Sequence, residues 1–343
     1  MAEIAGQPDA IRRAASGHDQ GVFESLRRLA TGRFPVFTGM GSSYDACYPA
    51  IAELARHGHV SMMLDAAELL HFRSPMLDAR TIVIAVSQSG ESAEVVSLAR
   101  ALARREVRPP VIAVTNGTDN SLATLVDAVL DTHAGIETGP STMTFAASLV
   151  VLGAVAGVLT GRPTDAVMTS LRRSAAQAAH ALERLVADEA LPGRVLATIG
   201  PRPHKVILAR GPARAAAEMG ALTIKEAAGV PVESLATAQF RHGPLELAGP
   251  ELGAMVIATE PETRGLDLAL AVELAGDGAS VVAVTSEPAD VRGVETIAIG
   301  DLDRALAPAV SIVPAQLLAR ELAIARGRDP GAYIRATKVT TRE

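Results

Sequence analysis

The sequence has only one cysteine, Cys47, which excludes an internal disulfide framework. It also lacks a hydrophobic run long enough for a membrane span: the longest, FAASLVVLGAVAGVL at 145–159, is shorter than the ~20 residues that a span needs. Its many alanine and glycine residues predict a buried, closely packed helix. The first residues carry charge in place of the apolar region of a signal peptide. We therefore expect a cytoplasmic protein with no membrane partner.

Strong positive charge is also missing. The net charge is −6, and the lysines and arginines are scattered, so we expect no nucleic-acid partner. His57 and His59 form an H-x-H pair, but no third ligand is identifiable nearby, so we expect no metal site. With 343 residues, 48% of them hydrophobic, the chain can bury a large core and is long enough for two domains.

The second half of the chain repeats the strand-like segments of the first. VFTGMG at 36, VIAVS at 83 and VIAVTN at 111 have counterparts in the same order, 170 to 173 residues later. Such continuous apolar strands are typical of parallel sheets covered by helices, and a nearly constant offset indicates one fold used twice. The sequence predicts an α/β protein of two tandem doubly wound domains, residues 1–165 and 166–343. Ligand loops should lie beyond the carboxyl ends of the strands.

Two of these loops, TGMGSSYDA and VSQSGES, place serines at a strand-to-helix junction. Free backbone N–H groups at a helix start, together with hydroxyls and an amide, suit a phosphate dianion. Tyr44 stands where a dinucleotide fingerprint has its third glycine, and no G-K-[ST] forms a P-loop. The serines could instead be helix caps and turn formers. Two such loops in neighbouring positions favour a phosphate site.

Several motifs together resemble a known family. GMGSSYDA, VSQSGES, ETGPSTMTF, IKEAAGVPVESLATAQFRHGPLEL, VPAQLLA and ATKVTTRE resemble the tandem sugar-isomerase (SIS) domains of the isomerase half of glucosamine-6-phosphate synthase. Amino-sugar-phosphate deaminases and fructosamine-phosphate deglycases are shorter relatives. The resemblance implies a phosphosugar partner, a homodimer and no organic cofactor. Ala2 stands where the synthase has its glutaminase cysteine, so we expect no glutamine hydrolysis.

The resemblance also implies roles for individual residues. Glu226 would shuttle a proton between C1 and C2 of the sugar, His242 would assist ring opening, and Lys338 would close on the open-chain sugar. From the residues alone, these could equally be a solvated helix residue, a turn residue and a surface lysine. The implied phosphate-binding residues are Gly41, Ser42, Ser43, Ser87, Gln88, Ser89 and Ser92.

The chain departs from the synthase pattern near Glu226. Met219 and Thr223 replace a glutamate and a lysine on the same helix face, and Met143 replaces a lysine in the first half. Gln239 stands where the family usually has glutamate. We predict a phosphosugar isomerase or deaminase that acts on an amino-sugar 6-phosphate. The alternatives are a fructosamine-6-phosphate deglycase and a sugar-phosphate sensor without catalysis.

Overall fold

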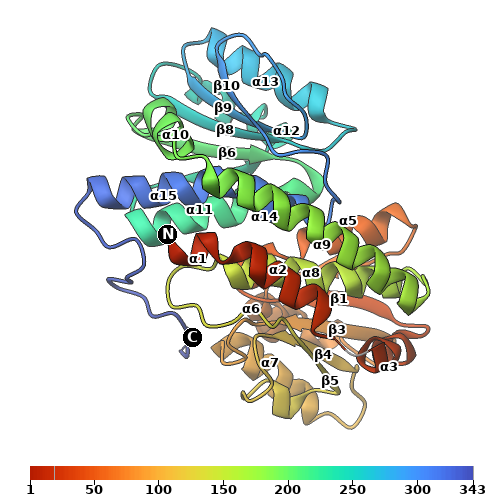
Figure 1. The fold of residues 1–343 in the computed structure, drawn as a ribbon. Helices are drawn as coiled ribbons and strands as arrows, with labels where there is room; N and C mark the ends of the chain where they lie inside the picture. The colour runs from red at the N-terminus through yellow and green to blue at the C-terminus, as the bar shows by residue number, and fades with distance from the viewer. Residues whose placement is uncertain (19, 343) are drawn as a thin grey trace. The chain divides into compact units, whose positions relative to one another are not determined.

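The computed structural model describes residues 1–18 and 20–342. The chain divides into two compact units, each built around one sheet (Figure 1). The first-sheet unit contains residues 9–137, 141–176 and 335–343, and the second-sheet unit contains residues 1–8, 138–140 and 177–334. Both units draw on segments that are far apart in the sequence, and the last residues of the chain belong to the unit formed by its first half.

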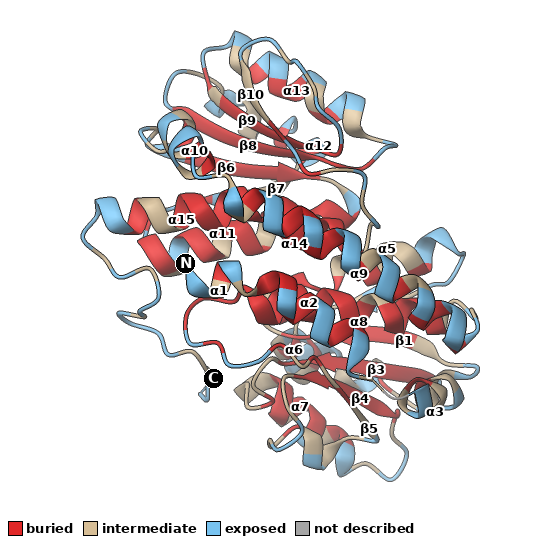
Figure 2. Cartoon of the chain, in the orientation of Figure 1, coloured by how far each residue is buried: buried red, intermediate tan, exposed pale blue. Residues whose placement is uncertain are grey.

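The first sheet consists of five parallel strands. All six residues of TIVIAV at 81–86 and all five of VIAVT at 111–115 are buried (Figure 2). A parallel sheet with helices on both faces requires such continuous apolar runs. Across the sheet the strands are β2 (Met62–Met63), β1 (Phe34–Thr38), β3 (Thr81–Val86), β4 (Val111–Thr115) and β5 (Ala128–Asp131).

Helices cover both faces of the first sheet. On one face lie α6 (Ala66–Glu68), the π-helical turn η1 (Leu69–Arg73) and α7 (Ala93–Ala103). The other face carries α3 (Gln20–Ala30), α5 (Tyr48–Arg56) and α8 (Met143–Leu159). The unit also contains α4 (Ser42–Asp45), η2 (Ser74–Met76) and η3 (Ala123–Leu125), and it shares α2 (Gln7–Ser16) and α9 (Thr164–Ala187) with the second-sheet unit.

The helix α8 confirms the prediction of a buried helix at 145–159. Nearly every side chain along it is buried. Gly157 explains the close packing, because a Cβ atom there would lie 3.0 Å from Cγ1 of Val167 on α9. The small residue therefore lets two helices of this unit approach each other.

The second sheet also consists of five parallel strands. Its central strand, LGAMVIA at 252–258, is buried over its whole length. Across the sheet the strands are β10 (Val294–Ala298), β9 (Ser280–Thr285), β8 (Leu252–Ala258), β6 (His204–Ala209) and β7 (Glu233–Ala236).

Helices cover this sheet on both faces as well. On one face α10 (Leu191–Ile199) and α11 (Arg214–Ala228) pack on the strands, with α15 (Val313–Ala325) against both helices. On the other face lies α13 (Arg264–Gly276), whose leucines join a buried cluster with β6, β8 and β9. The remaining helices of the unit are α1 (Ala2–Ala5), η4 (Gly211–Ala213), α12 (Thr237–Phe240), η5 (Pro244–Leu247) and α14 (Ala307–Ser311).

The two sheets confirm the predicted repeat. Strands β1, β3 and β4 correspond to β6, β8 and β9, and the strand order is the same in both sheets. Local details recur as well: the hydroxyl of Thr115 donates to the carbonyl of Gly117 (2.6 Å), and that of Thr285 donates to the carbonyl of Glu287 (2.7 Å). The fold is therefore α/β, with two doubly wound domains in tandem. The predicted boundary at residue 165 stays a prediction.

One helical stretch among the described residues is long and apolar enough to cross a membrane by length and composition. It runs from Ala307 to Ala325 and includes α14 and α15. Its apolar window is 83% buried, and α15 packs against α10 and α11. The stretch therefore serves as core of the second-sheet unit.

His18 is a half-buried histidine in the first-sheet unit. Its ring lies 5.3 Å from the rings of both Phe23 and His133, measured between centroids. Burial lowers the pKa of His18 to about 4; a charge on His133 acts in the same direction, and the carboxylate of Asp131 opposes it. The folded protein therefore holds this imidazole neutral at pH values where an unfolded chain would protonate it.

We expect stability to fall as the pH decreases from 6.5 towards 4, because only the unfolded chain takes up the proton on His18 in that range. The contribution is complete above pH 6.5, and the free energy of unfolding at pH 5 should be about 2 kcal/mol below that at pH 7. Urea unfolding at the two pH values measures this difference. His18→Phe should remove most of it, whereas His180→Gln, at a 69% exposed side chain, should not. Equal pH dependence in the wild type and His18→Phe would contradict the prediction.

Candidate functional site

The two serine loops follow the neighbouring strands β1 and β3, and a hydrogen bond joins them. Gly41 has a φ of 51° and leads the chain into α4. A Cβ atom on Gly39 would lie 2.9 Å from the carbonyl oxygen of Val86, so only glycine lets the first loop pass this close to β3. The hydroxyl of Ser43 accepts from the backbone N–H of Gln88 at 3.3 Å. The structure thus brings predicted ligands from both loops together.

Hydroxyls within the second loop are only partly used as caps and turn formers. Ser92 is the N-cap residue of α7, but its side chain does not cap the helix. Instead its hydroxyl lies 3.0 Å from the hydroxyl of Ser87. Ser89 does act as a turn former, because its hydroxyl accepts from the backbone N–H of Glu91 at 3.1 Å. The cap interpretation therefore does not account for Ser87 and Ser92.

The second loop is fixed against the loop that follows β4. Gly90 has a φ of 65°, and a Cβ atom there would lie 2.0 Å from Oδ1 of Asn120. The carboxylate of Glu91 accepts from the backbone N–H of Ser121 at 2.7 Å, and this hydrogen bonding holds the pKa of Glu91 below its usual range. These contacts hold the loop in place without a ligand.

A buried carboxylate lies beside the first loop, and it was not among the predicted site residues. The hydroxyl of Ser42 donates to that of Ser141 at 3.1 Å. Nearby, Glu137 is 8% exposed and accepts from the backbone N–H of Thr142 (2.8 Å) and Thr144 (3.2 Å) and from both hydroxyls. Glu137 therefore satisfies the first N–H groups of α8. The sequence signal was the ETGPSTMTF motif, in which a carboxylate precedes four hydroxyl residues.

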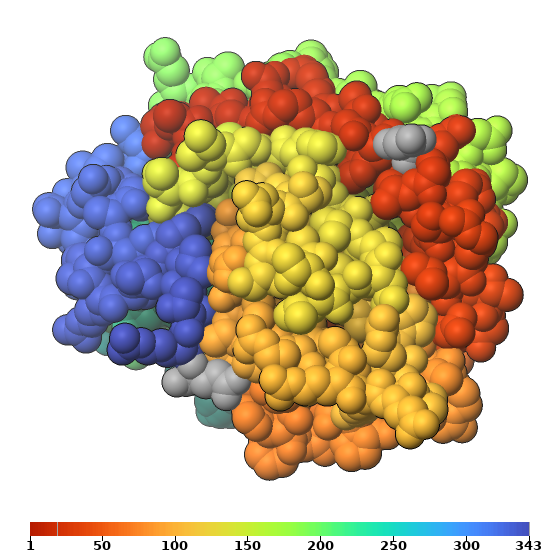
Figure 3. Space-filling view, turned by 90° about the horizontal axis from the view of Figure 1, so that it is seen from below, coloured from red at the N-terminus to blue at the C-terminus, as the bar shows by residue number. Residues whose placement is uncertain are grey.

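The C-terminal tail brings Lys338 to this carboxylate. Its Nζ atom donates to Oε2 of Glu137 at 2.7 Å, and the lysine side chain is 19% exposed. Two residues later, the carbonyl of Thr340 accepts from the backbone N–H of Ala93, the first residue of α7. In Figure 3 the dark blue tail lies against the orange and yellow surface of this unit. Lys338 is therefore not a solvated surface lysine.

Glu137→Gln should loosen the start of α8. The amide has one acceptor oxygen in place of the two that now receive four threonine donors, and it loses the charge that holds Lys338. We expect backbone hydrogen exchange at Thr142 and Thr144 to become at least about tenfold faster. Lys338→Met is the matched control, because it leaves the threonine contacts in place. If both substitutions accelerated this exchange equally, or if Glu137→Gln did not accelerate it, Glu137 would not be the residue that holds the start of α8.

The predicted proton-transfer residues belong to the second-sheet unit. Glu226 is half-buried on α11, and His242 is exposed in the turn after α12. The backbone N–H of His242 donates to the carbonyl of Gln239 at 2.9 Å, and Gly243 has a φ of 116° that reverses the chain. Glu226 and His242 thus lie in one unit, while the predicted phosphate ligands and Lys338 lie in the other.

Two departures from the synthase pattern lie on α11, and both are buried. Met219 is fully buried, and Thr223 is 4% exposed. The hydroxyl of Thr223 donates to the carbonyl of Met219 at 2.8 Å, within the same helix. The hydroxyl of Thr223 is therefore hydrogen-bonded within α11.

Cys47 and the histidine pair play no part in this arrangement. Cys47 is fully buried, its Sγ donates to the carbonyl of Ser43, and burial raises the pKa of its thiol. These properties indicate a packing role for Cys47. Across residues 1–18 and 20–342, no three His, Cys, Asp or Glu residues are grouped so that they could hold a metal ion.

The sequence matches the SIS domain over residues 35–157 and 200–326. The chain therefore belongs to the SIS domain family. It is 30% identical over 340 residues to a glutamine–fructose-6-phosphate aminotransferase (isomerizing) of Thermococcus kodakarensis, a match that covers 96% of this chain and 56% of the relative. The chain thus spans about half the length of this relative.

Solved structures share the fold. The C-terminal domain of glucosamine-fructose-6-phosphate aminotransferase from Francisella tularensis superposes with a TM-score of 0.85 at 21% identity, over 96% of both chains. A glucosamine-6-phosphate deaminase from Thermotoga maritima gives a TM-score of 0.71 at 20% identity, over 97% of this chain and 99% of that one. Both likenesses confirm the tandem SIS architecture.

Proposed function

We propose that the chain is a phosphosugar isomerase-type enzyme that releases the nitrogen of an amino-sugar 6-phosphate. The observation that carries the proposal is the pair of serine loops at the ends of β1 and β3, in the same unit as Lys338. A hydrogen bond from the backbone N–H of Gln88 to the hydroxyl of Ser43 joins the two loops. Hydroxyl and backbone N–H donors at strand-to-helix junctions suit a phosphate dianion. The relatives' names supply the sugar class: fructose 6-phosphate for one and glucosamine 6-phosphate for another.

The proposed phosphate ligands are those of the two serine loops. Ser42, Ser43, Ser87 and Ser92 would donate hydroxyl protons, and Gln88 would donate its amide. Gly41 and Ser89 would bring backbone N–H groups close to the phosphate. None of these groups carries a charge, so the phosphate would be held by hydrogen bonds and by the helix starts.

The proposed chemistry needs only proton transfers. His242 would help open the sugar ring by moving a proton between the ring oxygen and O1. The carboxylate of Glu226 would then take the proton from C2 of the open-chain aldose and return it to C1. In the same step O1 gains a proton and the nitrogen loses one, which leaves an alcohol at C1 and an imine at C2. Water adds to this imine, and ammonia leaves as the ketose forms. Side chains can perform each transfer, so we propose no cofactor.

Lys338 is the proposed cation of the site. Paired with Glu137, its ammonium group would stand beside the phosphate loops as a fixed positive charge. A covalent role would require a neutral amine, and the ammonium would first have to leave Glu137. We therefore propose that Lys338 positions and neutralises the open-chain sugar phosphate.

The proposal is tested with a panel of 6-phosphates: glucosamine, N-acetylglucosamine, galactosamine, fructose with ammonia, and fructosamine conjugates. Ammonia release and ketose formation from an amino sugar would support it. Amine release confined to fructosamine conjugates would indicate a deglycase. Thermal stabilisation by a compound without any turnover would indicate a sensor.

We also propose a cytoplasmic homodimer. His242 is exposed, so it could reach a site on a partner subunit. Light scattering of the purified chain gives the molar mass that tests the dimer.

A further inference from the structure

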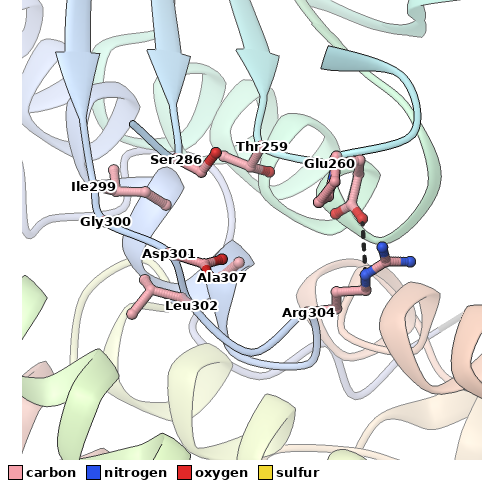
Figure 4. A pocket seen from close by; sticks show the side chains of 10 residues that line it. Thr259, Glu260, Ser286, Ile299, Gly300, Asp301, Leu302, Arg304 and Ala307 are labelled. Carbon is pink, nitrogen blue, oxygen red and sulfur yellow. Dashed lines mark ion pairs between the residues drawn. The ribbon is translucent and has the colours of Figure 1, made fainter. Parts of the chain in front are cut away.

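A cavity lies at the carboxyl edge of the second sheet, and the ligand proposed for it goes beyond the proposed function. Its volume is about 50 Å³, and it lies between the loops that follow β8, β9 and β10 (Figure 4). The polar side chains around it are those of Thr259, Glu260, Ser286, Asp301 and Arg304. All of them belong to the second-sheet unit.

One wall of this cavity is the loop after β8, which corresponds to the second serine loop of the first sheet. Thr259 and Glu260 directly follow β8, as Ser87 and Gln88 follow β3. The positive φ of Gly41 in the first serine loop also recurs, because Gly211, which follows β6, has a φ of 54°. A Cβ atom on Gly211 would first meet the side chain of Glu260, 4.0 Å away. In open α/β sheets this edge is where ligands bind.

Thr259 brings an unused hydrogen-bonding group to the cavity. Its side chain is among the lining groups and is only 7% exposed. Within the described part of the chain, its hydroxyl has no hydrogen-bond partner. A buried hydroxyl without a hydrogen-bond partner destabilises the fold, and a ligand in the cavity that bonded to it would remove this cost.

The charges around the cavity favour a cation. Glu260 is 5% exposed, and its Oε2 atom lies 3.8 Å from Nε of Arg304, the ion pair drawn in Figure 4. Arg304 also pairs with Glu262. Asp301 adds a second carboxylate to the lining. A carboxylate where the first sheet has Gln88 repels a phosphate dianion and accepts protons from an ammonium group.

We propose that this pocket binds the ammonium group of a small amine that carries no phosphate. The carboxylate of Glu260 and the hydroxyl of Thr259 would accept its protons. The hydroxyl of Ser286 already accepts from Arg264 at 2.9 Å and has a lone pair left for a third contact. Two sources share this chemistry, the free ammonium ion and an amino sugar such as glucosamine. The cavity volume of about 50 Å³ has room for an ammonium group.

Thermal unfolding of the full chain tests the pocket. Ammonium chloride, methylammonium chloride and glucosamine hydrochloride are compared with tetramethylammonium chloride at equal ionic strength. We expect ammonium and methylammonium to raise the unfolding temperature and tetramethylammonium to have no effect. Stabilisation by glucosamine beyond that by ammonium would identify an amino sugar as the better ligand; the reverse order would identify free ammonium.

Two substitutions locate the effect. Glu260→Gln and Thr259→Val should each weaken amine binding at least about tenfold, which corresponds to about 1.4 kcal/mol. Glu251→Gln, at a 76% exposed side chain in the same unit, should leave it unchanged. Glu226→Gln should also keep amine binding, which separates this pocket from the proposed catalytic site. Equal stabilisation by tetramethylammonium, or binding that survives both pocket substitutions, would overturn the proposal.

Discussion

Glu226→Gln should lower kcat for ammonia release from an amino-sugar 6-phosphate by about 100- to 10,000-fold, the range typical for loss of a general base. Glutamine keeps the size of the side chain on the half-buried face of α11 but cannot take a proton from C2. The substrate KM should change little, because the phosphate loops belong to the other unit. Steady-state assays of both kinetic parameters measure this separation.

Glu233→Gln is the matched control for this substitution. Glu233 is an exposed carboxylate on β7, in the same unit, and has no proposed part in the reaction. Its loss should leave kcat within about twofold of the wild type, because an exposed charge contributes little. If Glu226→Gln lowered kcat by less than threefold, Glu226 could not be the base.

Ser89→Asp should weaken binding of the sugar phosphate by at least about 100-fold, or about 3 kcal/mol. The substitution places a negative charge at one of the proposed phosphate ligands of this loop, all of which are neutral donors. Ser89 is half-buried at the loop surface, so the larger side chain can be accommodated. Calorimetric titration with inorganic phosphate and with glucosamine 6-phosphate measures the loss.

Thr169→Asp adds the same charge at an exposed position of α9, in the same unit but outside the serine loops. Phosphate affinity should then stay within about twofold of the wild type, because an exposed charge that does not contact the phosphate is screened by water and salt. Equal weakening by both substitutions would show that net charge, and not the loop, sets the affinity. No weakening by Ser89→Asp would place the phosphate elsewhere.

The sheets could be predicted because parallel strands leave a strong local signal. TIVIAV at 81–86 and LGAMVIA at 252–258 are apolar throughout, and the structure buries every residue of both. Strands with helices on both faces need such runs, so the periodicity and the repeat could both be read from the sequence. The serine loops followed from these strands, since a strand end followed by a helix fixes where a loop must lie.

The contacts of Glu137 could not be predicted in the same way. Its partner Lys338 lies 201 residues away along the chain, and no local pattern pairs the two. The cavity beside Glu260 was missed for a related reason. The second half has TEPETR after β8 where the first half has SQSGES after β3, so the loop carries no phosphate motif. Only the fold shows that the two loops occupy equivalent places.

The fate of the proton on C2 tests the central proposal most directly. Glucosamine 6-phosphate labelled with deuterium at C2 is incubated with the enzyme, and NMR follows the label while ammonia is measured. We predict that the label leaves C2 in step with ammonia release, and that it appears at C1 of the ketose or in water. Glu226→Gln should suppress both events together. Ammonia release that is unaffected by Glu226→Gln, or no loss of label with any amino-sugar 6-phosphate, would contradict the account.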